Sequence, residues 1–157
     1  MLKVRLIWVG KTRQGFAKEG MAFFEKRLRP FVLLETVEIK AASHSGRDAA
    51  IAVGQEGEAI LGKIGPDERV VLLDETGDLI DSRGLAGWLK GAAEESVAAL
   101  TFVIGGAYGV DSSVRKRAQR ILALSPMTFP HQLVRLIIME QLYRAATLNA
   151  GHGYHHD

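Results

Sequence analysis

Two stretches of the chain combine residue types that can hold a flat ring. In the first, FVIGGAYG, an apolar run ends at Gly105 and Gly106. Because glycine has no Cβ, the backbone there can turn sharply or let a planar ligand come close. The spacing is GGxxG rather than GxGxxG, no acidic residue follows about twenty positions later, and there is no GxxxxGKS/T loop. Nicotinamide dinucleotides and nucleoside triphosphates are therefore disfavoured, while a tight turn and a ligand loop both remain open.

The second stretch, LSPMTFP, joins a short apolar run to a long segment with helical periodicity. Pro126 and Pro130 stiffen this loop, so that it can aim successive backbone amides and carbonyls at a base such as adenine. Met127 and Phe129 can form apolar walls around such a ring. The alternative is a plain strand-to-helix connection whose apolar side chains pack into the core.

Histidine is concentrated in the last segment of the chain, GHGYHHD. Three histidines, His152, His155 and His156, suggest a metal site. However, Gly151 and Gly153 provide no rigid element to fix ligand geometry, and the chain has no cysteine to complete a shell. We therefore predict no metal, and the segment is either a frayed terminus or a tail that touches a substrate.

The hydrophobic pattern predicts a regular alternation of strands and helices that would position these residues. Five apolar runs predict strands: KVRLIWV, FVLLETVEI, RVVLLDE, LTFVIGG and ILAL. A turn is predicted at 76–78 and an exposed loop at 40–47. Helices are predicted over 14–28, from a cap at Asp48 to just before Gly65, over 82–95, from Asp111 or Ser112 to Arg120, and over 131–149.

This alternation predicts an α/β fold, a mainly parallel sheet with helices on both faces, in a single domain spanning residues 1–157. Parallel neighbours need crossover connections, which the intervening helices supply. In open sheets of this kind, ligands bind at the carboxyl ends of the strands. The loops after Leu73, Ile104 and Leu124 are therefore the predicted ligand loops.

Composition narrows the class of protein further. The absence of cysteine excludes disulfides and thiolate zinc sites and is typical of a reducing compartment. Lys3 and Arg5 interrupt the first apolar run, which therefore lacks the core of a signal peptide, and no apolar run is long enough to span a bilayer. We predict a cytoplasmic protein without a membrane segment.

Charge is compatible with a nucleic-acid partner without requiring one. The net charge is +2 and the pI is about 9.0. Each local cluster of positive charge is either a contact to nucleic acid or a solvated helix face. The clusters are Lys11, Arg13 and Lys18, then Lys26, Arg27 and Arg29, and finally Arg115, Lys116, Arg117 and Arg120.

The predicted terminal helix is apolar on more than one face. Packing on the sheet takes one face, so a second copy of the chain is a natural partner for the other, and we predict a homodimer. Ile138 is predicted to lie on the partner side. Arg135, Tyr143 and Arg144 interrupt the apolar pattern and are either functional or paired.

Four motifs, VVLLDETG, FVIGGAYG, LSPMTFPHQLVRLIIMEQLYRA and the closing GYHH, give the chain a family resemblance. Together with an opening strand that ends in VGK and the EKRL element before Pro30, they occur in the order typical of ribosomal RNA large-subunit methyltransferases of the H type. The chain resembles that family over its whole length. The resemblance implies a SPOUT-class fold with a C-terminal trefoil knot, and a homodimer. A knot does not follow from the pattern, since chains rarely thread their own loops.

The resemblance implies S-adenosylmethionine as the cofactor, which has no phosphates and so needs no phosphate-binding lysine. The implied substrate is N3 of a pseudouridine in large-subunit (23S) ribosomal RNA, methylated on the assembled ribosome. Pro126 is expected to contribute backbone rather than side chain. Carried over by motif, the cofactor-contacting residues are Leu73, Gly105, Leu124, Ser125, Pro126, Met127, Thr128 and Phe129.

Methylation at N3 requires a weakly acidic imide to lose its proton, so the site needs a general base or donors to the ring oxygens. His155 is the predicted general base, and Tyr154 would stack on or hydrogen-bond the flipped nucleobase. Arg144 would contact phosphates or ring oxygens. His131 is a competing candidate for the general base. A structural role, as a helix cap or a core residue, is an equally good interpretation of His131. Two other functions remain open, a ribosome-binding module without catalysis and a flavodoxin-like nucleotide binder, and the missing phosphate loop disfavours the second.

Overall fold

One parallel sheet forms the centre of the molecule, because each predicted apolar run supplies a strand and the helices between them supply the crossovers. The computed structural model describes residues 1–43 and 48–157, in which five strands are found. These are β1 (Lys3–Val9), β2 (Leu33–Ile39), β3 (Glu68–Leu79), β4 (Ala99–Ile104) and β5 (Arg120–Ala123), in the order β2-β1-β4-β3-β5.

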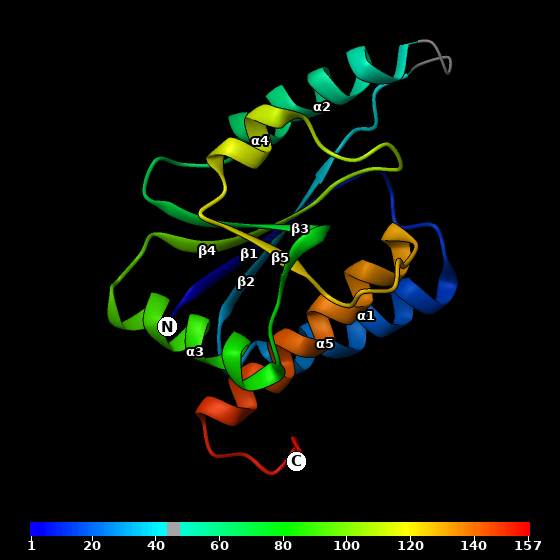
Figure 1. The fold of residues 1–157 in the computed structure, drawn as a ribbon. Coiled ribbons are helices and arrows are strands. Elements are labelled where there is room, and N and C mark those ends of the chain that lie inside the picture. The colour runs from blue at the N-terminus through cyan, green and yellow to red at the C-terminus, as the bar shows by residue number, and fades with distance from the viewer. Residues whose placement is uncertain (44–47) are drawn as a thin grey trace.

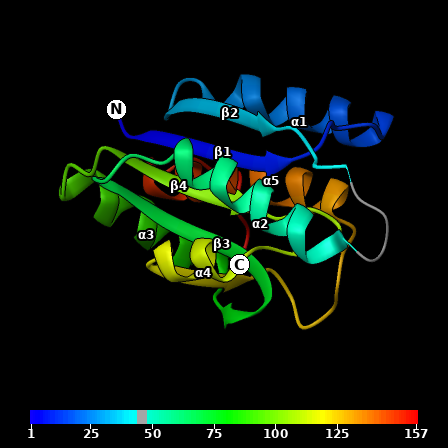
Figure 2. The same ribbon diagram turned by 90° about the horizontal axis from the view of Figure 1, so that it is seen from above.

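Helices cover both faces of the sheet, as the two views show (Figures 1 and 2). Successive side chains of a strand point to opposite faces, so β1 sends Leu6 and Trp8 into one core and Ile7 and Val9 into the other. The first core is closed by α1 (Gly15–Leu28), α3 (Ser82–Glu94) and α5 (His131–Asn149), and the second by α2 (Ala49–Gly62) and α4 (Ser112–Arg117).

The predicted fold class is confirmed, since the sheet is parallel throughout and carries helices on both faces. Helix starts also agree with the capping signals. Asp48 occupies the N-cap position of α2, although its side chain makes no cap hydrogen bond there, and the Asp111 carboxylate accepts a hydrogen bond from the Ser113 amide at the start of α4. The trefoil knot stays a prediction from the family resemblance.

The turn predicted at 76–78 is wrong, because β3 continues through it to Leu79. Its pairing with β5 shifts register between Leu73 and Asp78. Gly77 permits this, since a Cβ there would lie 2.6 Å from the carbonyl oxygen of Ile121. A glycine flanked by threonine and aspartate is typical of a turn, but here its missing side chain allows two strands to approach closely.

The predicted end of one helix also needs correction, and one predicted loop lies partly outside the described residues. The helix predicted to reach Arg120 ends at Arg117, because Ala118 adopts extended backbone and Arg120 already belongs to β5. The loop predicted at 40–47 includes residues 44–47, which lie outside the described residues.

The terminal helix α5 begins and ends where the sequence predicted, but the prediction that Ile138 lies on the partner side is wrong. Ile138 is fully buried in the core of its own chain, on the face that packs against the sheet. The half-buried apolar side chains of α5 are instead Leu133, Val134, Leu136, Ile137 and Leu148, of which Val134, Leu136 and Leu148 also pack against the core of their own chain. No helix within the described ranges is long and apolar enough to cross a membrane.

Candidate functional site

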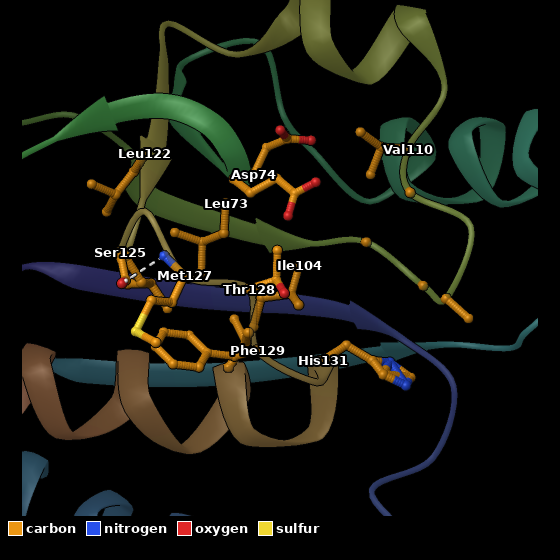
Figure 3. A pocket seen from close by; sticks show the side chains of 17 residues that line it. Leu73, Asp74, Ile104, Val110, Leu122, Ser125, Met127, Thr128, Phe129 and His131 are labelled. Atoms are coloured by element: carbon orange, nitrogen blue, oxygen red, sulfur yellow. Dashed lines mark hydrogen bonds between the residues drawn. The ribbon is translucent and has the colours of Figure 1, made fainter.

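A pocket of about 280 Å³ lies at the carboxyl ends of β4 and β5, beside the irregular part of β3 (Figure 3). This is the edge of the sheet at which the sequence predicted the ligand loops. Pro126 belongs to the loop after β5 but is not among the lining residues. The pocket wall includes seven of the predicted cofactor-contacting residues, Leu73, Gly105, Leu124, Ser125, Met127, Thr128 and Phe129.

Gly105 forms a tight turn and part of the pocket wall at once. A Cβ on Gly105 would lie 2.7 Å from Cγ1 of Val110 and 3.1 Å from the carbonyl oxygen of Gly109, because the loop folds back onto it. The Gly109 amide donates to the Gly106 carbonyl over 3.1 Å, and Gly109 has a φ of +85°. A tight turn and a ligand loop, the two alternatives left open for the paired glycines, are therefore compatible with one another.

Two carboxylates that sequence reasoning did not single out, Asp74 and Glu75, also line the pocket. Asp74 accepts hydrogen bonds from the amide and hydroxyl of Thr76, at 2.8 and 2.6 Å, and pairs with Arg115 at 2.9 Å. Partial burial opposes ionisation of Asp74, but Thr76 and Arg115 outweigh it and lower the pKa. Because Arg115 balances the charge of Asp74, the net negative charge at this rim comes from Glu75, and it suits a ligand that carries positive charge.

His131 lines the opposite side of the pocket, at the first turn of α5 (Figure 3). Burial lowers the pKa of its imidazole, and the positive charge of Arg135 lowers it further, so His131 is neutral at pH 7. Its Nδ1 atom is buried and has no hydrogen-bond partner among the described residues. A neutral imidazole next to a ligand pocket is able to accept a proton, which keeps His131 as a candidate general base.

The other predicted catalytic residues form a second cluster, where the closing tail meets the later part of α5. The Tyr154 hydroxyl donates to Oε1 of Glu140 over 3.1 Å, and Arg144 donates to the same oxygen from Nε over 3.0 Å. Arg144 also contacts Nδ1 of His155 at 3.3 Å. Glu140 was missed by sequence reasoning, although its spacing from Arg144 by four helix positions was a usable signal.

Protonation within this cluster follows from its contacts. Because the Arg144 guanidinium is only a donor, Nδ1 of His155 accepts, and Nε2–H then donates to Asp157 over 3.0 Å. Both nitrogens of His155 are therefore occupied in this arrangement. Burial raises the pKa of Tyr154, and the charge and hydrogen bond of Glu140 raise it further, so Tyr154 keeps its proton and acts as a donor.

The tail is docked on its own chain rather than frayed. The Tyr154 ring packs edge-on against Tyr143, with centroids 4.7 Å apart, and Asp157 pairs with Arg83 of α3. In the described part of the chain, histidines and carboxylates form no group of three or more that could hold a metal ion.

Helix α5 runs from the loop after β5 to the closing tail (Figure 1), and the pocket and the tail cluster involve different ends of it. His131, in the first turn, lines the pocket, whereas Arg144, in the last part of the helix, belongs to the tail cluster. At the rise of an α-helix, these positions are about 20 Å apart along the axis. The structure brings the cofactor-contacting candidates together and keeps the tail candidates away from them within one chain.

Comparison with known proteins gives consistent matches over the length of the chain. The family model described as "Predicted SPOUT methyltransferase" matches residues 2–155. Two proteins named Ribosomal RNA large subunit methyltransferase H are similar to the chain. The one from Pelobacter propionicus is 40% identical over 155 residues, covering 99% of this chain and all of that protein. The one from Solidesulfovibrio magneticus is 42% identical over 156 residues, with the same coverage.

A solved structure is similar in fold. The crystal structure of a probable methyltransferase from Bordetella pertussis Tohama I has a TM-score of 0.57 and 14% sequence identity. The match covers 92% of this chain and 96% of that one.

Proposed function

Because the chain belongs to the SPOUT methyltransferase family, we propose that it methylates N3 of a pseudouridine in large-subunit ribosomal RNA, with S-adenosylmethionine as the methyl donor. The observation that carries this proposal is identity of about 40% over nearly the whole chain to proteins named Ribosomal RNA large subunit methyltransferase H. Use of S-adenosylmethionine is general in the family. The pseudouridine, the position N3 and the ribosomal substrate are the proposed part.

The pocket at the strand ends has the chemistry that this cofactor requires. Its apolar walls, Met127 and Phe129, and the backbone-rich loops suit an adenine ring. The carboxylates of Asp74 and Glu75 suit the positively charged sulfonium and ammonium groups. When bound, the cofactor supplies an electrophilic methyl group. The chain's own residues must then hold the nucleobase in line with that group and remove the N3 proton.

The tail cluster contains the groups for this second task. Tyr154 and Arg144 are donors that would stabilise the ring oxygens as negative charge develops on the imide. His155 would accept the N3 proton once RNA binding draws Arg144 away from Nδ1. His131, neutral and in the pocket wall, is the competing general base.

A single chain keeps the pocket and the tail cluster apart, so we propose that the active site is assembled from two chains. If two copies of α5 pack antiparallel about a two-fold axis, the pocket end of one helix lies beside the tail end of the other. Half-buried Leu133, Leu136 and Ile137 form an apolar stripe along the first half of α5. On the neighbouring helix α1, Phe16 and Phe23 are also exposed, by 55% and 48%. Burial of this surface would drive dimer formation.

Replacing Ile137 with aspartate is expected to weaken the dimer at least tenfold, because two charges would be buried near the two-fold axis. The matched control is Ile51→Asp, which makes the same change at a 62% exposed position on α2. Light scattering at a series of micromolar concentrations gives the mass of each variant, and circular dichroism checks its fold. A monomeric unmodified protein would remove the dimer, and an undisturbed Ile137→Asp dimer would remove the proposed interface.

The proposed activity is tested by incubating the protein with S-adenosylmethionine that carries a labelled methyl group. The acceptors are ribosomes that lack the modification and, in parallel, the same RNA freed of protein. We expect label in large-subunit RNA of ribosomes and much less in free RNA, because a protein with a net charge of +2 binds the phosphate backbone only weakly without specific contacts. Equal labelling of free RNA would contradict recognition of the ribosome. Unlabelled ribosomes, with cofactor bound, would favour a binding module without catalysis.

A further inference from the structure

The loop between β1 and α1 is held by the side chain of Gln132, in the first turn of α5. Nε2 of Gln132 donates to the carbonyl oxygen of Lys11 over 3.0 Å. Oε1 of Gln132 accepts from the amides of Arg13 at 2.9 Å and of Gln14 at 3.4 Å. One amide side chain thus binds the backbone on both sides of the loop, which is more than a hundred residues away in the sequence.

A second side chain of α5, Arg135, fixes the same loop from inside. Arg135 is fully buried and donates to the hydroxyl of Thr12 over 2.9 Å and to the carbonyl oxygen of Val9 over 2.7 Å. Its guanidinium also lies over the ring of Trp8, 5.3 Å from the centroid. Gln132 thus makes three hydrogen bonds to the backbone of the loop, and Arg135 adds one to the Thr12 hydroxyl and one to the end of β1, so the loop's side chains leave from fixed positions.

The outward side chains of this loop, Lys11 and Arg13, are exposed and form no ion pair within 1–43 and 48–157. Lys18 and Glu19 follow near the start of α1 and their charges offset one another, so the loop residues Lys11 and Arg13 contribute a net charge of +2. Most other arginines are engaged on the protein: Arg5 with Glu68, Arg29 with Glu25, Arg69 with Glu95, Arg83 with Asp157, Arg115 with Asp74 and Arg144 with Glu140.

The loop also lies beside the pocket. His131 and Val134 line the pocket and belong to the same stretch of α5 as Gln132 and Arg135, which hold the loop. Both views show the loop next to the chain that leads into α5 (Figures 1 and 2). Two cations without an ion pair thus lie on a fixed backbone at the side of the pocket.

From this arrangement we propose that Lys11 and Arg13 bind backbone phosphates of the RNA substrate next to the methylated nucleotide. The inference rests on the proposed function, since it takes ribosomal RNA as the substrate. Flexible cationic side chains on a rigid loop suit phosphates, which position a nucleic acid without reading its sequence. The loop is therefore a positioning element for RNA and has no part in the chemical step.

The test is the double variant Lys11→Gln/Arg13→Gln, compared with Lys26→Gln/Lys63→Gln. The control pair removes the same charge, but its residues are exposed near the ends of α1 and α2, at the opposite edge of the sheet. Binding of the large subunit is measured over a range of salt concentrations without cofactor. We expect the loop variant to bind on the order of tenfold more weakly, with a salt slope smaller by about two, because each lost phosphate contact releases about one counterion fewer.

Two further measurements separate this inference from the proposed function. The loop variant should bind S-adenosylmethionine normally by calorimetry, and should reach the unmodified kcat on saturating ribosomes with a raised KM. If its affinity and salt slope equal those of the control pair while the unmodified protein methylates ribosomes, the phosphate contact is wrong and the function stands. Gln132→Leu, which keeps both cations but releases the loop, should also weaken binding. Unchanged binding of Gln132→Leu would contradict the role of the clamp.

Discussion

A protein that ends at Gly153 is expected to bind S-adenosylmethionine as the full chain does and to transfer methyl groups about 100- to 10,000-fold more slowly. Loss of a positioned general base typically has an effect of this size. The deletion removes Tyr154 and His155 from the cluster with Glu140 and Arg144, while the pocket wall is built from much earlier residues and the first turn of α5. Calorimetry measures cofactor binding, and label transfer to ribosomes measures the rate.

Single substitutions divide this effect among the groups of the tail. His155→Ala should lose most of the activity. Tyr154→Phe keeps the ring against Tyr143 and removes only the hydrogen bond to Glu140, so it tests the hydroxyl alone. His152→Ala is the matched control, because it removes an exposed histidine of the same tail outside the cluster. If the shortened protein methylates ribosomes at the normal rate, the tail has no catalytic role, and His131 and Arg144 must carry the reaction.

Mixing two inactive variants is expected to restore about a quarter of the normal activity, if each active site combines the pocket of one chain with the tail of its partner. One variant lacks Tyr154 to Asp157. The other, Thr128→Trp, blocks the pocket from an exposed position in its wall. Half of a random mixture of dimers pairs the two variants, and each such dimer holds one intact pocket beside one intact tail.

The same mixture tests the opposite arrangement. If the pocket and tail of one chain formed a site together, no dimer in the mixture would contain an intact site, and activity would stay absent. Each variant re-assembled with itself is the control for reactivation by the mixing procedure. Co-expression with two different tags allows the mixed dimer to be purified and its activity measured alone.

The sheet and its helices were predictable because every strand and helix has a local hydrophobic pattern, and parallel pairing follows from their alternation. What failed depends on contacts between distant segments. Gly77 lies against the backbone of Ile121, which no local pattern around Gly77 indicates. Ile138 was assigned to the wrong face because α5 is apolar on more than one face, so periodicity does not identify the side that meets the sheet.

Of the candidate site, the pocket loops were predictable, whereas two pocket carboxylates and the docked tail were not. The pocket loops follow from the rule that ligands bind at the carboxyl ends of parallel strands, and the resemblance supplied the individual positions. Asp74 and Glu75 were missed although they directly follow Leu73, because a carboxylate at a strand end is as often a turn residue. The docked tail depends on long-range contacts of Tyr154 with Glu140 and Tyr143, which flanking glycines gave no reason to expect.

Nucleoside analysis of the methylated RNA tests the central claim most directly. Ribosomes that lack the modification are treated with the protein and S-adenosylmethionine, and large-subunit RNA is digested and analysed by mass spectrometry. We predict one new nucleoside, pseudouridine methylated at N3, with the methyl group derived from the labelled cofactor. A methyl group on a ribose, on another base or on another ring position, or no methylated nucleoside at all, would contradict the proposed function.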